Sequence, residues 1–188
     1  MAIGTNAASV GQGDRCVAVG FGAGFGTQGD ESIAIGDFAG QSIQGAESVA
    51  IGFECAETAQ GTQSVAMGYR CGRGTQGTQS VAIGFECGQT GQGPNNVAIG
   101  YRAGQTGQTG ANVAIGSEAG QVNQGLDQGF CVAIGVQAGQ INQDRLCVAI
   151  GNAAGQYNQS EISVAIGHLA GQYSLDRDWE TPIATQKP

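Results

Sequence analysis

Apolar and polar residues recur along this chain with a period of 16 residues. A four-residue phrase, Val-Ala-Ile-Gly or a close variant, marks each repeat. Its glycine falls at Gly4, Gly20, Gly36, Gly52, Gly68, Gly84, Gly100, Gly116, Gly135, Gly151 and Gly167. Every step is 16 residues except the one from Gly116 to Gly135, which is 19. A period this short predicts a solenoid, in which each rung buries its apolar residues against the rungs above and below.

We number the positions of a rung from the first residue of the phrase. Positions 1 and 3 carry Val or Ile except at Met1 and Met67, and Val and Ile favour strands. Glycine at position 4, and usually at position 8, indicates corners where the backbone needs positive φ or close approach. We therefore expect two short strands and two turns per rung, and eleven rungs would stack into a rod on the order of 50 Å long.

The first strand is apolar on both faces, which is typical of a strand covered on both sides. Because two sheets facing each other lie about 10 Å apart, we expect the Val and Ile side chains to fill the interior. The alanine of position 2 would then face outward, toward a partner chain. We expect position 6 to lie on the second strand and to face water, and position 7, always Ala or Cys, to face inward.

Several columns of polar or aromatic residues are interpreted first as packing. Position 6 alternates in charge over five rungs and would form a ladder that fixes the register. Glutamine at position 12 predicts an amide ladder that bonds along the stack and satisfies turn backbone. Position 5 holds an aromatic series that favours ring stacking, with surface binding to a glycan as the alternative. The aromatic series is Phe53, Tyr69, Phe85 and Tyr101.

Six cysteines occupy two columns, Cys55, Cys71 and Cys87 at position 7 and Cys16, Cys131 and Cys147 at position 16. Each replaces a small residue, which favours a packing role. The rung spacing would permit a disulfide between Cys131 and Cys147. Without Cys-x-x-Cys pairs or histidine partners, no metal site is expected. We assign no catalytic, cofactor-binding or metal-binding residues, and His168, the single histidine, is expected on the surface.

The composition narrows the function classes. The net charge of −8, with a single lysine, disfavours nucleic-acid binding. The chain opens directly in the repeat, without a visible secretory signal or an apolar run long enough to span a membrane. Either a leader has been removed, or the protein assembles in a cytoplasm, as six cysteines without a disulfide framework suggest. No cofactor is expected.

Three functions of repeat proteins fit the pattern poorly. Hexapeptide acyltransferases have an 18-residue rung and need a catalytic histidine between chains, whereas this rung has 16 residues. Ice binding requires an unbroken threonine face, but Thr58, Thr90 and Thr106 skip rungs. Calcium-binding β-rolls require Gly-Gly-x-Gly-x-Asp, which this sequence lacks. We therefore expect a protein that is not an enzyme.

Ser48-Val49-Ala50-Ile51-Gly52, with its repeats, resembles the head repeat of trimeric autotransporter adhesins. The longer form, Ala114-Ile115-Gly116-Ser117-Glu118-Ala119-Gly120-Gln121, is similar to repeats in fibre proteins of phages and large DNA viruses. The resemblance implies a left-handed parallel β-roll with three chains side by side, and it carries over no catalytic residues. No neck or stalk sequence follows, and adhesin heads have a shorter rung that seldom holds cysteine.

These observations predict an all-β fold: a flat, parallel β-solenoid domain over residues 1–175 and a tail or cap over 176–188. The expected function is a structural fibre or spike segment of a virus particle, acting as a rigid spacer or host-attachment element. Its partners would be two further copies of itself, other virion components and a host receptor, and its place the virion surface after assembly in the host cytoplasm. The alternative is an extracellular adhesin head that binds matrix or glycan.

Two irregular segments carry expectations of their own. The 19-residue step predicts a bulge in a turn near Gly125–Phe130, because a strand ladder tolerates no shift of phase. The tail, with Trp179 and two prolines, is expected to fold over the last rung or to dock on another component.

Overall fold

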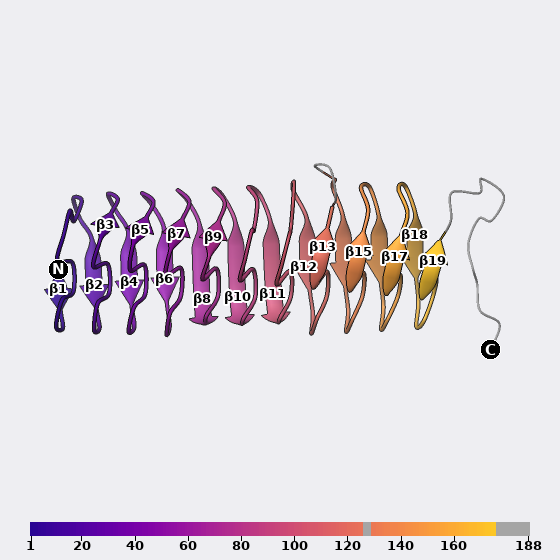
Figure 1. Cartoon of the computed structure of the whole chain (residues 1–188), viewed down its shortest axis with the longest axis horizontal. Helices are drawn as coiled ribbons and strands as arrows, with labels where there is room; N and C mark the ends of the chain where they lie inside the picture. Colours follow the sequence, from indigo (N-terminus) through magenta and orange to yellow (C-terminus); the bar gives the residue numbers. More distant parts are fainter. Residues whose placement is uncertain (126–128, 176–188) are drawn as a thin grey trace.

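A computed structural model describes residues 1–125 and 129–175; the expected tail and the centre of the 19-residue step lie outside them. The described chain is an all-β parallel solenoid, and it contains no helix. Its rungs follow one another along a single axis (Figure 1). The predicted fold class is therefore confirmed.

Position 1 to position 3 of every rung form one continuous sheet, which we call the major sheet. All its strand pairs are parallel and in register, so that Val81 pairs with Val65 and with Val97. Three of its strands extend to the aromatic residue of position 5. The strands are β1 Ala2–Ile3, β2 Val17–Val19, β4 Ile33–Ile35, β6 Val49–Ile51, β8 Val65–Tyr69, β10 Val81–Phe85, β11 Val97–Tyr101, β12 Val113–Ile115, β14 Val132–Ile134, β16 Val148–Ile150 and β18 Val164–Ile166.

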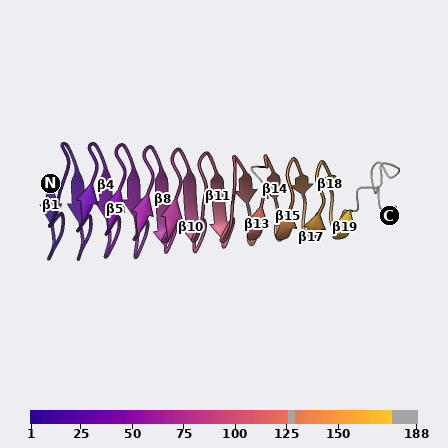
Figure 2. The same cartoon turned by 45° about the horizontal axis from the view of Figure 1, so that its top comes forward.

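The second strand of the rung forms two shorter sheets that end at position 12. The N-terminal minor sheet contains β3 Thr27–Gln28, β5 Ile43–Gln44, β7 Ala59–Gln60 and β9 Thr75–Gln76. The C-terminal minor sheet contains β13 Val122–Gln124, β15 Ile141–Gln143, β17 Tyr157–Gln159 and β19 Tyr173–Leu175. Both lie across the solenoid from the major sheet (Figure 2). Between them the two rungs that contain Gln92 and Gln108 make only isolated bridges.

The second strand is not where the sequence placed it. Position 6 lies in a turn that follows the first strand, and its residues adopt left-handed backbone, with φ of 54° at Arg70 and 51° at Glu86. Because a left-handed residue reverses the chain direction, the turn is complete before position 9 and the second strand begins at position 10 or 11. Position 7 faces inward, as predicted, and Ala23 and Cys55 are fully buried.

The two faces of the first strand are the reverse of our expectation. Alanine at position 2 is buried in every rung from Ala18 onward, whereas Val and Ile at positions 1 and 3 point outward and are half-buried or exposed. The volume argument failed because it left glutamine out of the interior. Gln28 and Gln44 are 1% exposed, and their long side chains fill the space between the sheets that we had given to Val and Ile.

Glycine at position 4 has a specific reason. Its φ lies between 122° and 137° in all eleven rungs, and a Cβ at Gly84 would collide with the carbonyl oxygen of Gly100 in the next rung. The rungs can therefore stack at strand spacing only because this column has no side chain. The 19-residue step keeps the phase as predicted, since Val113 pairs with Val132 and Ala114 with Ala133.

Candidate functional surfaces

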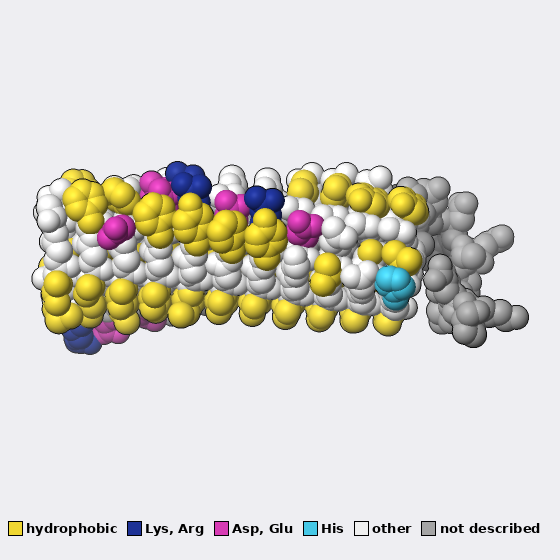
Figure 3. All heavy atoms as spheres, turned by 90° about the horizontal axis from the view of Figure 1, so that it is seen from below, with side chains coloured by type: hydrophobic (Ala, Val, Ile, Leu, Met, Phe, Trp, Pro, Cys, Tyr) yellow, Lys and Arg dark blue, Asp and Glu magenta, His cyan; other side chains and the backbone are white. Residues whose placement is uncertain are grey.

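The Val/Ile stripe, formed by the outward side chains of positions 1 and 3, is an apolar band on the surface of the described rungs. It follows the major sheet through all eleven strands, and a continuous row of hydrophobic side chains runs the length of the rod (Figure 3). Exposure reaches 55% at Ile3 and 63% at Ile166. Contiguous apolar bands of this kind are typical of surfaces that pack against another molecule.

The aromatic row lies beside this stripe, and it contains the predicted binding residues Phe53, Tyr69, Phe85 and Tyr101 (Figure 3). Successive rings are stacked, with centroids 5.5, 4.9 and 5.4 Å apart and planes within 14° of parallel. The rings therefore cover one another's faces, as the packing interpretation predicted. Each ring remains about two-fifths exposed, but it presents its edge to solvent, and binding by this row stays a prediction.

The charge ladder of position 6 is divided into separate ion pairs. Arg70 Nε lies 2.7 Å from Glu54, and Arg102 Nε lies 2.9 Å from Glu86, so each arginine pairs with the preceding rung. Hydrogen bonds to these carboxylates raise the pKa of both guanidinium groups. Glu118 ends the series by accepting hydrogen bonds from two glutamines of the next rung.

The two arginines also join the charges to the aromatic row. Each guanidinium carbon lies about 5 Å above the centroid of the tyrosine that precedes it, Tyr69 or Tyr101. Stacked rings and ion pairs thus support each other over four rungs, which favours a structural role for both.

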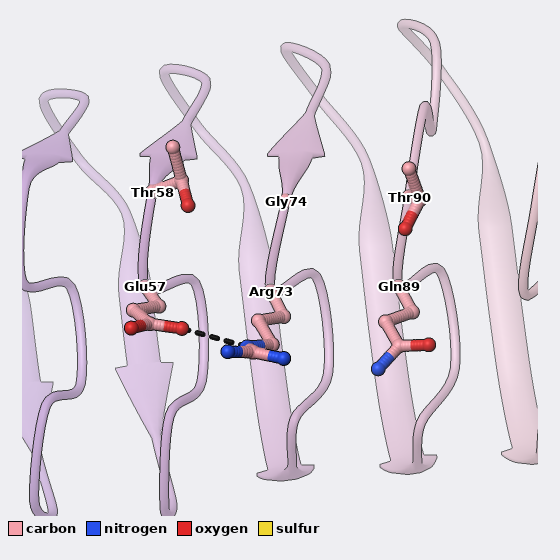
Figure 4. A pocket seen from close by; sticks show the side chains of 6 residues that line it. All are labelled: Glu57, Thr58, Arg73, Gly74, Gln89 and Thr90. Atoms are coloured by element: carbon pink, nitrogen blue, oxygen red, sulfur yellow. Dashed lines mark hydrogen bonds and ion pairs between the residues drawn. The ribbon is translucent and has the colours of Figure 1, made fainter.

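A shallow polar hollow of about 450 Å³ is lined by residues of positions 9 and 10, which follow the turn that contains position 6. Its centre is Gly74, which interrupts a run of hydroxyl residues at position 10; Thr58 and Thr90 flank it, and Glu57, Arg73 and Gln89 form a row beside it (Figure 4). Sequence analysis missed this hollow, although the glycine within a Ser/Thr column was a visible signal.

Charge at the hollow is balanced. Arg73 Nε lies 2.7 Å from Glu57 and 3.3 Å from Glu54, so the arginine is shared between two carboxylates. The hollow therefore offers no net positive charge to an anion, and its chemistry is that of a hydrogen-bonding surface.

Glutamine at position 12 is the main polar component of the interior, and its predicted structural role is confirmed. Gln28 Nε2 donates to the carbonyl oxygen of Val17 across the roll, at 3.0 Å, and Gln60 Nε2 donates to that of Val49, at 2.8 Å. These bonds connect the second strand of a rung to its first strand.

All six cysteines are free thiols and all are buried. Cys131 and Cys147, the pair for which we considered a disulfide, donate to the carbonyl oxygens of Asp144 and Ser160. The hydrogen bond from the Cys131 thiol lowers the pKa of Cys147 to about 7. Sequence analysis did not single out Cys71 and Cys87, whose sulfur atoms lie 2.8 Å apart.

The remaining groups make no site. His168 is exposed on the surface, as predicted. Within residues 1–125 and 129–175, no group of three or more His, Cys, Asp or Glu side chains could hold a metal ion. The same residues include no helix of the length and apolar character needed to cross a membrane. Comparisons with protein-family models, with curated proteins and with solved structures find no match to this chain.

Proposed function

We propose that this chain is a structural segment without enzymatic activity, a rigid rod that associates side by side with two further copies. The observation that carries the proposal is the Val/Ile stripe, which is apolar, regular and as long as the major sheet. A single chain would expose this stripe to water along its whole length, and association removes it from water.

Rigidity follows from how the rungs are joined. Successive rungs are joined by backbone hydrogen bonds in the sheets and turns, and several of them also by ion pairs or amide bonds on their edges. Any bend would have to open several of these ladders together. Together with the resemblance to fibre repeats, this construction supports a spacer or attachment element of a fibre on a virus particle, displayed at the virion surface.

The experiment combines the mass in solution with charge placed on chosen faces. For the parent we expect the mass of three chains. Met67→Glu with Ile83→Glu places two carboxylates on the stripe and should yield a folded single chain, because burying unpaired charge is costly. Thr62→Glu with Thr78→Glu adds the same charge at exposed positions of a different edge and should keep the oligomer.

A further variant separates folding from association. Ala82→Glu puts the same group into the interior, where Ala82 is fully buried, and should unfold the rod rather than divide it. A single-chain parent would overturn the proposal, and so would an oligomer that survives both stripe substitutions.

The second candidate function is an adhesin head that binds matrix or glycan. The observation that favours it is the row of exposed ring edges and ion pairs over four rungs. A glycan and matrix array probed with the parent should then show saturable binding that is lost when Tyr69 and Phe85 are both replaced by serine. Equal signals from parent and variant would contradict the adhesin function, and the spacer function would remain as the only candidate.

A further inference from the structure

Cysteine replaces alanine at position 7 in three consecutive rungs in the middle of the rod. Cys55, Cys71 and Cys87 are all fully buried in the interior, where the other rungs carry Ala at the same place. Alanine would fill this position equally well, so packing alone does not require a thiol here.

Cys71 and Cys87 are in direct contact. Their sulfur atoms lie 2.8 Å apart, closer than the roughly 3.5–4.0 Å at which non-bonded heavy atoms pack best. The register around them is fixed, because Gly68 pairs with Gly84 and Tyr69 with Phe85. Neighbouring rungs about 4.8 Å apart fall within the range of Cα separations, about 4.4–6.8 Å, that a disulfide bridges.

We propose that Cys71 and Cys87 are a site of covalent cross-linking between two rungs, at which a small peroxide oxidises the paired thiols to a disulfide. The oxidant must be small because both sulfurs lie inside the closed roll. It reaches them when these rungs open locally or before they close during folding.

The chemistry takes two steps. The Cys71 thiolate attacks one oxygen of hydrogen peroxide and breaks the O–O bond; the departing hydroxide takes up the thiol proton, leaving a sulfenic acid and water. The Cys87 sulfur then attacks the sulfenic sulfur, and the hydroxide that leaves takes the proton of Cys87 as a second water. Two electrons pass from the sulfur pair to the peroxide oxygens.

Cys71 is the first nucleophile because of its neighbour. The hydrogen bond from the Cys87 thiol lowers the pKa of Cys71, and the same contact raises that of Cys87. Burial raises the pKa of Cys55 to about 12, so its thiol stays protonated at neutral pH. The Cys71 thiol itself donates to the carbonyl oxygen of Gly84, as the Cys131 and Cys147 thiols do to those of Asp144 and Ser160, so the short sulfur–sulfur distance to Cys87 is what distinguishes Cys71.

The consequence is a covalent bond between β8 and β10 at the centre of the rod. The bond closes a loop of one rung and prevents the two rungs from separating, in addition to the hydrogen bonds that already join them. The rod would then resist opening most strongly where the thiols meet.

The sequence makes the bond easy to locate by peptide mapping. Trypsin cleaves after Arg70 and Arg73, so Cys71 leaves in a three-residue peptide and Cys87 in the peptide 74–102. The folded full chain is first reduced and freed of reductant, and it is then treated with about one equivalent of hydrogen peroxide per chain. Catalase stops the oxidation. The protein is alkylated in denaturant and digested with trypsin without further reduction. We expect the loss of two of the six thiols and one dominant cross-linked product joining these two peptides.

Matched variants keep the result interpretable. Cys55→Ala restores the residue of the other rungs and should still give the cross-link, whereas Cys71→Ala should retain the fold and lose it. Complete alkylation of Cys71 and Cys87 in the treated parent would overturn the proposal. A dominant link from Cys71 to Cys55, or from Cys131 to Cys147, would overturn it as well, because the contact in the structure would then not select the pair.

Discussion

The two minor sheets use the same buried glutamine in different ways. In the N-terminal minor sheet the amide nitrogen of position 12 donates to two carbonyl oxygens of its own rung, as Gln60 does to Val49 and Ser64. In the C-terminal minor sheet it donates across the roll and, where another glutamine follows, also to that glutamine, as Gln124 does to Gln143 at 3.1 Å. Only the second arrangement links successive rungs through the interior.

The residue before the glutamine decides between the two arrangements. Position 11 has left-handed backbone where it is Gly or Asn, with φ of 71° at Gly107 and 54° at Asn123. It has strand backbone where it is Thr, Ile or Ala, because these residues, unlike Gly and Asn, do not adopt left-handed conformations readily. Every glutamine that donates to the next glutamine follows a left-handed residue. These donors are Gln12, Gln92, Gln108, Gln124 and Gln143.

The direction of the backbone hydrogen bond at position 11 also differs between the two minor sheets. In the N-terminal minor sheet the Ala59 amide donates forward to Gly74 of the next rung, whereas the Asn123 amide donates backward to Thr106 of the preceding rung. A peptide that reverses its hydrogen-bond direction redirects the side chain that follows. The choice of one residue per rung thus sets the hydrogen bonding of the interior.

The N-terminal arrangement leaves hydrogen-bond acceptors in the interior without donors. The buried Oε1 atoms of Gln44, Gln60, Gln76 and Gln92 have no hydrogen-bond partner, and each lies one rung after a glutamine that follows a strand residue. An unpaired buried acceptor costs on the order of 1–3 kcal/mol. The C-terminal part should therefore be the more stable half of the rod.

The largest expected effect comes from removing one glutamine in each region. Gln124→Met keeps the length of the side chain but leaves Gln108 Nε2 and Gln143 Oε1 without their partners, and should cost about 3 kcal/mol. Gln60→Met should cost only about 1 kcal/mol, because it also removes the unpaired Oε1 atom of Gln60. In addition, the carbonyl oxygen of Ser64 still accepts a hydrogen bond from the Val49 amide. Urea unfolding of both variants measures the difference, and equal losses would contradict the comparison.

A substitution at position 11 tests the cause of the difference. Asn142→Val requires a β-branched residue at φ of 55° and removes the amide bonds to Asn123 and Asn158, so we expect a loss of about 2 kcal/mol. Thr75→Val, in the strand region, should change stability by less than about 0.5 kcal/mol. Asn142→Gly keeps the backbone conformation, and this variant should keep most of the stability that Asn142→Val loses. If the glycine variant is as unstable as the valine variant, the backbone is not the cause.

The reverse substitution should extend the ladder by one rung. Thr75→Asn lies next to the left-handed Gly91 and would allow Gln76 to donate to the unpaired Oε1 of Gln92. We expect a gain of about 0.5–1 kcal/mol, the net value of one buried hydrogen bond. The direct measurement is by NMR, as slower exchange of the Gln76 side-chain amide. A destabilised variant with unchanged exchange would show that strand pairing to Ala59 outweighs the new bond.

Parts of this comparison were readable in the sequence. The 16-residue period and the Val-Ala-Ile-Gly phrase predict the stacked strands, because the backbone has only one way to keep such columns in register. The change at position 11 from Thr27 and Ile43 to Gly107 and Asn123 was also visible, since glycine and asparagine are the residues that tolerate left-handed backbone.

Other parts were not readable, for physical reasons. The orientation of the first strand depended on which side chains fill the interior, and Gln44 is polar enough to suggest a surface or turn position. Glu54 and Arg70 give no sign of left-handed backbone, because their residue types rarely adopt it outside a turn that the whole rung imposes. The contact between Cys71 and Cys87 needed the rotamers of two side chains, which no spacing provides.

The smallest expected effect concerns the ion pairs outside both minor sheets. Arg102→Gln removes the pair with Glu86 on a partly exposed edge, where the Arg102 side chain is 38% exposed and water and salt screen part of the attraction. Its shift of the urea midpoint should be smaller than that of Gln124→Met, Asn142→Val or Thr75→Asn, and it should vanish at high salt, whereas the shift of Gln124→Met should persist. We attribute the stability difference between the two halves to buried amides and not to the charges that cluster in the middle of the rod, and the two salt dependences distinguish these causes. A salt-dependent loss from Arg102→Gln as large as that from Gln124→Met would assign the difference to the surface instead.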